Sequence, residues 1–597
     1  MTGDAPRHRR RAGPKALGLA AALVLTGGAV VVVGGGYGTA GPSRARPATE
    51  PARSAPAPRG TAEVSGRVTD GGGRPLPGAK ISVPRRRAVQ TDARGRYRAR
   101  VRLAGRPATL TAQRPGHVAQ AETVHGEGRQ RLDFDLWSTA AAPPGDDAAD
   151  RVILWSGCEN LIALRDSELE KLVDLGVDGF VCQVGRLKGL GGDHAFTGDR
   201  GAGLRGPAFA LQRRLRRSRL VQRRRELGLK LYLGFYVSNY WNAATPLAEW
   251  FDDGPWSRDV LPRVRDVTAA ARTLGFSGVA IDQELYRSRT DTATWAWDYP
   301  GNRRSESAVR AKATQRGAQL MRAFVGAFPG LEIVGYDTQL PGSWDARVQK
   351  ELNDVDDAYA DNVQTDFWDG LTGVRGYGSI RLFDAVFYKG TNVPGVTWDQ
   401  ALQQNARAVY SLFSREFSDW AYAAPRVHVT PFGWIDSGND GSDYERARPP
   451  DYVAEQLRAF RTWGAGGEFG VYAYRPPAEF DYRAYADGLR ASSARGQTDT
   501  EAPRIAVTAP GPGPRLEGLG EKVDLTGTAD DNLALRVVQW RDAQGRGGAA
   551  RLVPVGPGAG VSWRIEGLAV PPGEGMIWVR AEDIKGLATV QQLTLVR

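Results

Sequence analysis

The sequence predicts a multidomain fold, in which a (β/α)8 TIM barrel is flanked by two β-sandwich, immunoglobulin-like domains. Between residues 151 and 491, short apolar runs alternate with helical patterns, as the strands of a parallel barrel alternate with their covering helices. On either side, short strand patterns separated by Gly and Pro turns are typical of β-sandwiches. A length of 597 residues also exceeds that of one ordinary domain.

The first 40 residues carry an export signal. Basic residues precede an apolar run from Ala16 to about Val33, which is the pattern of a signal peptide or an uncleaved membrane anchor. We therefore expect an exported protein, either secreted or tethered at the cell surface. Residues 41–61 are rich in Pro, Ala, Arg and Ser and are expected to form a disordered linker.

Residues 62–137 are expected to form the first β-sandwich. They contain GRVTD at 66–70, PLPGA at 75–79 and TDARGRY at 91–97. This spacing resembles the carboxypeptidase regulatory-like domain, whose signature runs G-x-V-x-D, P-L-x-G-A and T-D-x-x-G-x-Y. The resemblance implies a spacer or binding module and does not imply peptidase activity.

After a linker at 138–150, the barrel is expected over residues 151–491. A doubly wound open sheet is the alternative, but its Gly-rich phosphate turn is absent after the first apolar run. The predicted strands lie at 152–156, 178–183, 229–236, 278–283, 332–336, 384–388, 427–432 and 469–474, and predicted helices include 257–274, 305–328, 398–417 and 451–463.

A third linker at 492–502 leads into residues 503–597, where strand patterns return. The motifs LTGTADDN at 525–532 and VRAED at 579–583 resemble those of bacterial immunoglobulin-like domains. The oxygens of Asp530, Asp531, Asn532 and Asp583 suit calcium. Such residues more often cap turns, so the sequence predicts no metal site.

The two cysteines, Cys158 and Cys182, follow or end the first two predicted barrel strands, which are neighbours in space. An exported protein keeps such a pair oxidised. We expect a disulfide, and two buried thiols are the alternative.

The fourth predicted strand ends in two carboxylates. Residues 274–286 read LGFSGVAIDQELY, with Asp282 and Glu284 at the end of the apolar run. Alternation puts both acids on one face, roughly 6.5 Å apart, at the end of the barrel where such enzymes keep their chemistry. Their repulsion would raise one pKa and leave the other acid ionised, which suits acid–base catalysis in an open, aromatic-walled groove. The alternative is that one acid caps a helix or pairs with an Arg.

The layout of the barrel resembles secreted glycoside hydrolases of the TIM-barrel type, which implies hydrolysis of O-glycosidic bonds in a polysaccharide by two acids. In chitinase-like families, Glu284 would be the general acid and Asp282 would orient the substrate, although the earlier acids of that motif are missing here. In the α-galactosidase-like clan, Asp282 would be the nucleophile and Asp337 or Asp366 the acid. We predict Glu284, Asp282 and Asp337 as catalytic.

Aromatic and acidic residues follow several predicted strands, as expected of a saccharide cleft. Trp250, Trp398 and Trp463 lie in helical patterns and are expected to fill gaps between helices and barrel. The predicted substrate contacts are Trp155, Tyr236, Trp241, Asp366, Trp368, Trp434, Asp436, Tyr472 and Tyr474.

Other classes of function lack their motifs. The net charge of +12 has no nucleic-acid motif beside it, so no nucleic-acid partner is predicted. The chain has 5 His, of which only His194 and His428 fall in the barrel, and it lacks G-x-S-x-G, which disfavours zinc and Ser-His-Asp hydrolases. No cofactor is predicted, and the oligomeric state is open. The alternative to an enzyme is a non-catalytic cell-surface glycan-binding protein.

Overall fold

The chain divides into two units, Met1–Pro56 and Ala57–Arg597. The structure, a computed structural model, describes only part of the second unit. The described residues are 59–70, 74–104, 106–124, 126–138, 151–183, 212–236, 250–282, 297–299, 301–336, 363–384, 397–436, 450–463, 468–473, 499–556 and 560–597. The expected export signal and the three linkers lie outside these ranges, apart from a few residues at the linkers' ends. None of the helices in these ranges has the length and apolarity needed to cross a membrane.

The first described domain is a pair of β-sheets. One sheet has the order β4-β1-β9-β6, with β8 beside β1, and the other has the order β3-β2-β5-β7. Strand β4 alternates strictly between exposed and buried residues, so that Tyr97, Ala99 and Val101 face the core. The strands are β1 (Arg59–Asp70), β2 (Lys80–Ser82), β3 (Val89–Gln90), β4 (Arg96–Ala104), β5 (Ala108–Gln113), β6 (His117–Val118), β7 (Gln120–Val124), β8 (Gly128–Arg131) and β9 (Phe134–Ser138).

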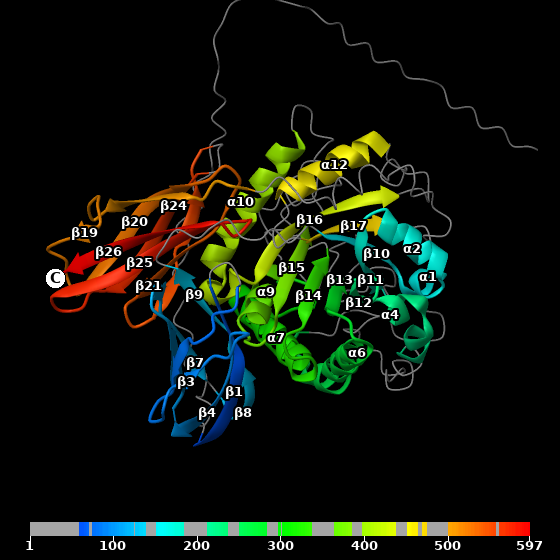
Figure 1. Cartoon of the computed structure of the whole chain (residues 1–597), viewed down its shortest axis with the longest axis horizontal. Coiled ribbons are helices and arrows are strands. Elements are labelled where there is room, and N and C mark those ends of the chain that lie inside the picture. The colour runs from blue at the N-terminus through cyan, green and yellow to red at the C-terminus, as the bar shows by residue number, and fades with distance from the viewer. Residues whose placement is uncertain are drawn as a thin grey trace, which may run out of the picture. The chain divides into compact units, whose positions relative to one another are not determined.

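The central domain is a closed parallel barrel of eight strands, β10 to β17 in chain order (Figure 1). Strand β10 pairs with β17 and closes the ring. The predicted barrel is therefore confirmed. Its strands are β10 (Arg151–Gly157), β11 (Val177–Gln183), β12 (Lys230–Tyr236), β13 (Gly278–Asp282), β14 (Glu332–Tyr336), β15 (Ser379–Asp384), β16 (Val427–Asp436) and β17 (Glu468–Ala473).

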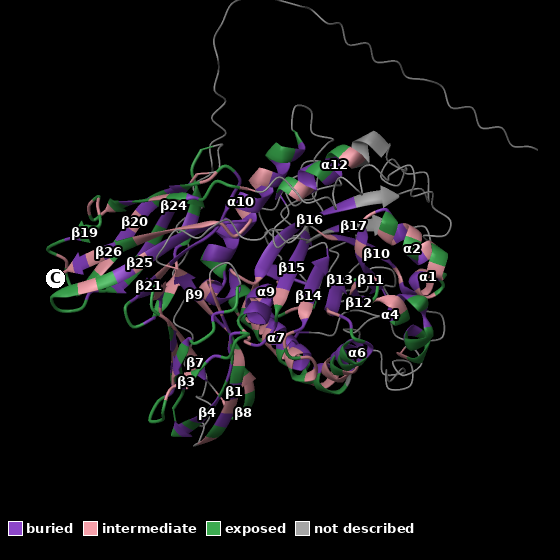
Figure 2. Ribbon diagram, in the orientation of Figure 1, coloured by how far each residue is buried: buried purple, intermediate pink, exposed green. Residues whose placement is uncertain are grey.

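Helices cover the outside of the barrel, and their outward faces are exposed while the strands are buried (Figure 2). Glycines let the helices α7 and α9 approach each other closely. A Cβ added to Gly317 of α7 would lie 2.0 Å from a backbone oxygen of α9, and one added to Gly370 of α9 would lie 1.9 Å from a backbone oxygen of α7. The helices are α1 (Cys158–Ile162), α2 (Asp166–Asp174), α4 (Arg219–Arg223), α5 (Asp253–Pro255), the π-helical turn η2 (Trp256–Val260), α6 (Leu261–Leu274), α7 (Glu306–Ala327), α9 (Gln364–Thr372), α10 (Trp398–Glu416), α11 (Trp420–Ala423) and α12 (Pro450–Trp463).

The amino-terminal part of the barrel interior holds a charged cluster around Glu332, the first residue of β14. Its carboxylate accepts hydrogen bonds from Lys230 Nζ at 2.9 Å, Tyr232 OH at 2.6 Å and Arg381 Nη1 at 3.3 Å. Burial raises the pKa of Glu332, but Arg381, Lys230 and the Tyr232 hydroxyl together hold it below its ordinary value. This cluster ties β12, β14 and β15 together at the end of the barrel where catalysis is not expected.

The last domain is a β-sandwich of two largely antiparallel sheets, in the orders β18-β20-β24-β23 and β19-β26-β25-β21-β22. Trp563, Leu525 and Val579 lie in its core. The strands are β18 (Arg504–Ala509), β19 (Arg515–Leu516), β20 (Lys522–Asp530), β21 (Leu535–Asp542), β22 (Gly547–Ala549), β23 (Arg551–Pro554), β24 (Val561–Ala569), β25 (Glu574–Asp583) and β26 (Ala588–Val596).

Candidate functional site

An aromatic cluster identifies the face of the strands that lines the barrel interior. The rings of Trp155 on β10 and Tyr336 on β14 have centroids 4.8 Å apart, and Phe432 on β16 lies 4.6 Å from Tyr336 and 6.2 Å from Trp155. These strands are not neighbours in the ring. Their side chains can meet only through the interior of the barrel, so this face points inward.

Asp282 is the last residue of β13, and its side chain points into the same interior. It is paired in register with the inward-facing Tyr336 of the neighbouring strand, and residues paired across adjacent strands share a face. Only 2 % of Asp282 is exposed. The expected open groove is therefore corrected at this position. The carboxylate is buried at the carboxyl end of the strand, the end where barrel enzymes act.

Gln183, the last residue of β11, holds this carboxylate across the intervening strand β12. Its Nε2 donates to Asp282 Oδ2 at 3.2 Å. The residue on β12 in register with Gln183 is Gly234, where an added Cβ would lie 2.3 Å from Gln183 Oε1. The glycine leaves the space through which the amide reaches the carboxylate, so three consecutive strands cooperate to position Asp282.

Gln183 was not among the site residues predicted from the sequence. The signal was available, because Gln183 is a polar residue that ends the apolar run of the second barrel strand, as Asp282 ends the fourth. Two further barrel strands also end in an aspartate, β15 at Asp384 and β16 at Asp436.

Two of the predicted substrate-contacting residues belong instead to the helical layer. Trp368 on α9 is fully buried, and its ring packs behind β14, where a Cβ on Gly335 would lie 2.8 Å from Trp368 Cζ2. Asp366 on the same helix forms an ion pair with Arg310 of α7 at 2.9 Å. Trp368 therefore packs α9 against the barrel and Asp366 joins α9 to α7, which corrects the prediction that they contact substrate.

Trp155 is also corrected. It exposes 2 % of its surface and is enclosed by Tyr336 and Phe432, so it fills the barrel interior and presents no free face to a sugar. Trp250, Trp398 and Trp463 are buried residues of the helical layer, as expected. His428, which the sequence placed in the core, is buried too, and burial above all holds its pKa well below the ordinary value.

The remaining predicted site residues lie at the carboxyl ends of the strands or beyond them. For Tyr236, Trp434, Asp436 and Tyr472 the structure describes the backbone only, with Tyr236 in register with Asp282, and Tyr472 in register with both Trp155 and Trp434. Glu284, Asp337, Trp241 and Tyr474 lie outside the described residues.

Cys158 and Cys182 form a disulfide, with their Cα atoms 4.3 Å apart. Cys158 begins α1 directly after β10, and Cys182 lies on the neighbouring β11. The bond therefore fastens the turn after the first barrel strand to the second strand, next to Gln183.

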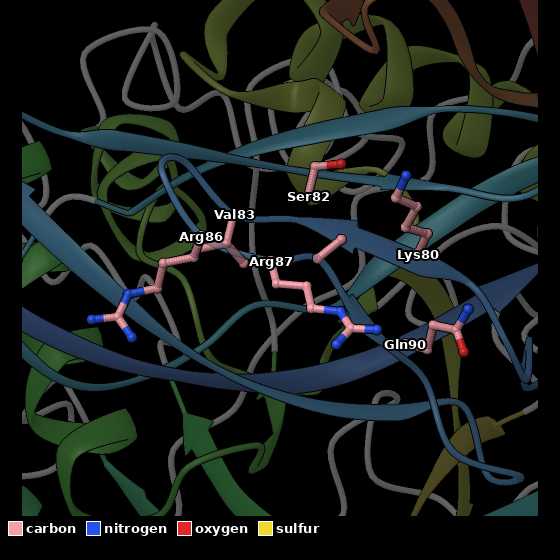
Figure 3. A pocket seen from close by; sticks show the side chains of 7 residues that line it. Lys80, Ser82, Val83, Arg86, Arg87 and Gln90 are labelled. Atoms are coloured by element: carbon pink, nitrogen blue, oxygen red, sulfur yellow. The ribbon is translucent and has the colours of Figure 1, made fainter.

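The first domain carries a surface hollow. It is lined by Lys80, Ser82, Val83, Arg86, Arg87, Ala88 and Gln90 (Figure 3). The guanidinium groups of Arg86 and Arg87 point in different directions in Figure 3, and both residues are exposed. The basic side chains do not converge on one point, so the hollow lacks the arrangement of a catalytic site.

Comparison with known proteins identifies one domain by family. Residues 63–136 match the carboxypeptidase regulatory-like domain, as expected from the motifs. No curated protein matches the chain.

Solved structures show distant similarity to glycoside hydrolases. A GH5_18 protein from Streptomyces cattleya, in complex with GlcNAc, is 12% identical with a TM-score of 0.36, over 62% of this chain and 84% of that one. A class V chitinase from Pseudomonas fluorescens Pf-5 is 11% identical with a TM-score of 0.30, over 58% and 99% of the two chains. A D-psicose 3-epimerase is 8% identical with a TM-score of 0.28, over 57% and 96%. At these scores the similarity carries no argument about this chain's reaction.

Proposed function

We propose that the chain is a glycoside hydrolase that cleaves O-glycosidic bonds of a polysaccharide at the carboxyl end of the barrel. The observation that carries the proposal is Asp282, a carboxylate buried at the end of β13 and held by the amide of Gln183. Burying a carboxylate costs free energy. A hydrolase needs a carboxylate fixed in position, which would account for this cost.

In this mechanism Glu284 is the general acid and Asp282 is the nucleophile or the orienting partner, with Asp337 as the third candidate. Glu284 is two residues beyond Asp282, and strand alternation would give it the same inward face. Glycoside hydrolysis by two acids requires one protonated group at the leaving oxygen and one ionised group near the anomeric carbon. We infer export, secreted or tethered at the cell surface, from the basic and apolar pattern of the first 40 residues.

The burial of Asp282 favours a second candidate, a non-catalytic cell-surface protein whose barrel binds glycan. A carboxylate with 2 % exposure reacts only if substrate reaches it from the carboxyl ends of the strands. In the non-catalytic case, Asp282 and Gln183 would be an internal hydrogen-bonded pair that orders the strand ends.

Incubation of the purified chain with a panel of bacterial wall and plant glycans, followed by a reducing-end assay, separates the two candidates. A hydrolase releases new reducing ends, and Asp282→Asn or Glu284→Gln lowers the rate by about 100-fold or more. Glu306→Gln, on the exposed start of α7, is the matched control and keeps the rate. Retention of glycan on a pull-down without new reducing ends would replace the hydrolase with the binding protein.

A further inference from the structure

We propose that Asp499, Asp531 and Asp583 form a calcium site in the last domain, at the point where the chain enters it. One carboxylate oxygen from each residue lies within 4.8 Å of the others. Two ligands that each lie about 2.4 Å from one calcium ion are at most about 4.8 Å apart, so the three oxygens can share an ion. The site is independent of the proposed hydrolase activity.

Three separate segments bring the acids together. Asp499 precedes β18, Asp531 directly follows β20, and Asp583 is the last residue of β25. Backbone contacts hold these segments in place, because Ile584 N donates to Ala534 O at 3.0 Å. The Asn532 side chain also donates to Asp499 Oδ1 at 3.1 Å. The fold of the domain therefore holds the three acids close together.

Each acid uses its Oδ1 to accept hydrogen bonds from the protein and leaves its Oδ2 without a protein partner. Asp531 Oδ1 accepts from Leu533 N at 2.9 Å, and Asp583 Oδ1 accepts from the backbone N–H groups of Lys585 and Leu587 at 2.7 and 2.9 Å. The second oxygen, Oδ2, of Asp499, Asp531 and Asp583 is buried and has no hydrogen-bond partner. The turn-capping role expected from the sequence and the metal-binding role are therefore both present, on different oxygens.

Asp583 gives independent evidence for a ligand. It is fully buried, its Oδ2 has no hydrogen-bond partner, and one of its carboxylate oxygens lies within 4.8 Å of an oxygen of each of the other two acids. Three carboxylates in one place repel one another and are costly to bury without a cation. Burial first, and then the neighbouring acids, raise the pKa of Asp583 to about 8, and burial raises that of Asp531 to about 7. The nearby Arg536 is ion-paired with Glu582, so its charge is shared with another acid.

Calcium fits this site better than a transition metal. All the ligand atoms are hard oxygens, and no His or Cys contributes among the described residues of the cluster. Three carboxylates leave several coordination positions for water, which is typical of sites with dissociation constants of roughly 0.1–1 mM in extracellular modules.

The test is calorimetric titration of CaCl2 into the full chain after removal of metal with EDTA, together with thermal unfolding. We expect one ion per chain and a higher unfolding temperature for the last domain in calcium. Asp531→Asn and Asp583→Asn keep the turn-capping oxygen and remove the charge, so each should weaken calcium binding about 10-fold or more. Asp530→Asn, exposed and one residue from Asp531, removes the same charge and should bind calcium as the wild type does.

The unfolding temperatures in EDTA show whether Asp531 and Asp583 act as calcium ligands or only stabilise the fold. In EDTA the variants Asp531→Asn and Asp583→Asn should unfold at the same temperature as the wild type or higher, because the substitution removes repulsion. The proposal is overturned if the wild type does not bind calcium at a calcium concentration 10-fold above the expected dissociation constant. Equal binding by wild type, Asp531→Asn and Asp583→Asn, or an equal loss in Asp530→Asn, also overturns it.

Discussion

The charged cluster around Glu332, at the amino-terminal end of the barrel strands, should contribute measurably to stability, and the structure allows the magnitude to be estimated. Glu332→Gln removes the negative charge that Lys230 and Arg381 face, while its amide oxygen still accepts from Tyr232. The exposed fractions of the three charged side chains are 26 % for Glu332, 18% for Lys230 and 8% for Arg381. Removing one partner of a fully buried ion pair costs about 3–5 kcal/mol, and partial exposure reduces this. We expect a loss of about 2–3 kcal/mol in the free energy of unfolding.

The pH dependence has a definite sign. The folded-state pKa of Glu332 lies below its ordinary value of 4.5, so its contribution is complete above that value and is lost as pH falls through the folded-state pKa. Urea denaturation followed by tryptophan fluorescence should show wild type and Glu332→Gln well separated at pH 7, and the two should converge as the pH falls below 4.5 and through the folded-state pKa of Glu332.

The matched control is Glu306→Gln, because Glu306 pairs with Arg310 at 2.8 Å but is 52% exposed. It should change the free energy of unfolding by only about 0.3–0.5 kcal/mol. A change below about 0.5 kcal/mol for Glu332→Gln at pH 7, or a difference that does not vary with pH, would refute the reasoning about this cluster.

Further predictions concern packing. Trp368→Ala should lower the free energy of unfolding by about 3–5 kcal/mol by opening a cavity behind Gly335, measured by denaturation; an unaffected fold with weaker glycan binding would restore Trp368 as a substrate contact. Gly370→Ala forces α9 away from α7 and should cost about 1–3 kcal/mol, whereas an unchanged midpoint of denaturation would mean that the helices separate freely. Cys158→Ser removes a disulfide that joins residues 24 apart in the sequence and should lower the free energy of unfolding by about 3 kcal/mol. The wild type treated with reductant should lose the same amount, and a variant as stable as the oxidised wild type would contradict the role of the bond.

The barrel could be predicted because its strands and helices carry strong local patterns. The helix expected at 305–328 is α7 (Glu306–Ala327), and the one expected at 398–417 is α10 (Trp398–Glu416). The sixth strand was placed at 384–388 but is β15 (Ser379–Asp384). Arg381 lies in the middle of this strand and breaks its apolar run, and its charged partner Glu332 is 49 residues away in the chain.

The candidate site was predictable in position but not in its partners. The end of the fourth apolar run, together with the alternation of side chains along a strand, placed Asp282 at the carboxyl end of the barrel. Its contact with Gln183 joins residues 99 apart in the chain, and no local pattern reports a contact of that kind. Trp368 was misplaced for a similar reason, since the space that it fills is created by Gly335 on a strand that the sequence places well before it. Tryptophan after a strand is a weak sign of substrate contact when a glycine faces it.

The most direct test of the central claim is the rate of reducing-end release from a glycan substrate by wild type, Asp282→Asn and Glu306→Gln, with folding checked by circular dichroism. If the carboxylate at the end of β13 performs hydrolysis, Asp282→Asn folds normally and loses about 100-fold or more of the rate, while Glu306→Gln is unchanged. A folded Asp282→Asn protein that hydrolyses glycan as fast as the wild type would contradict the account.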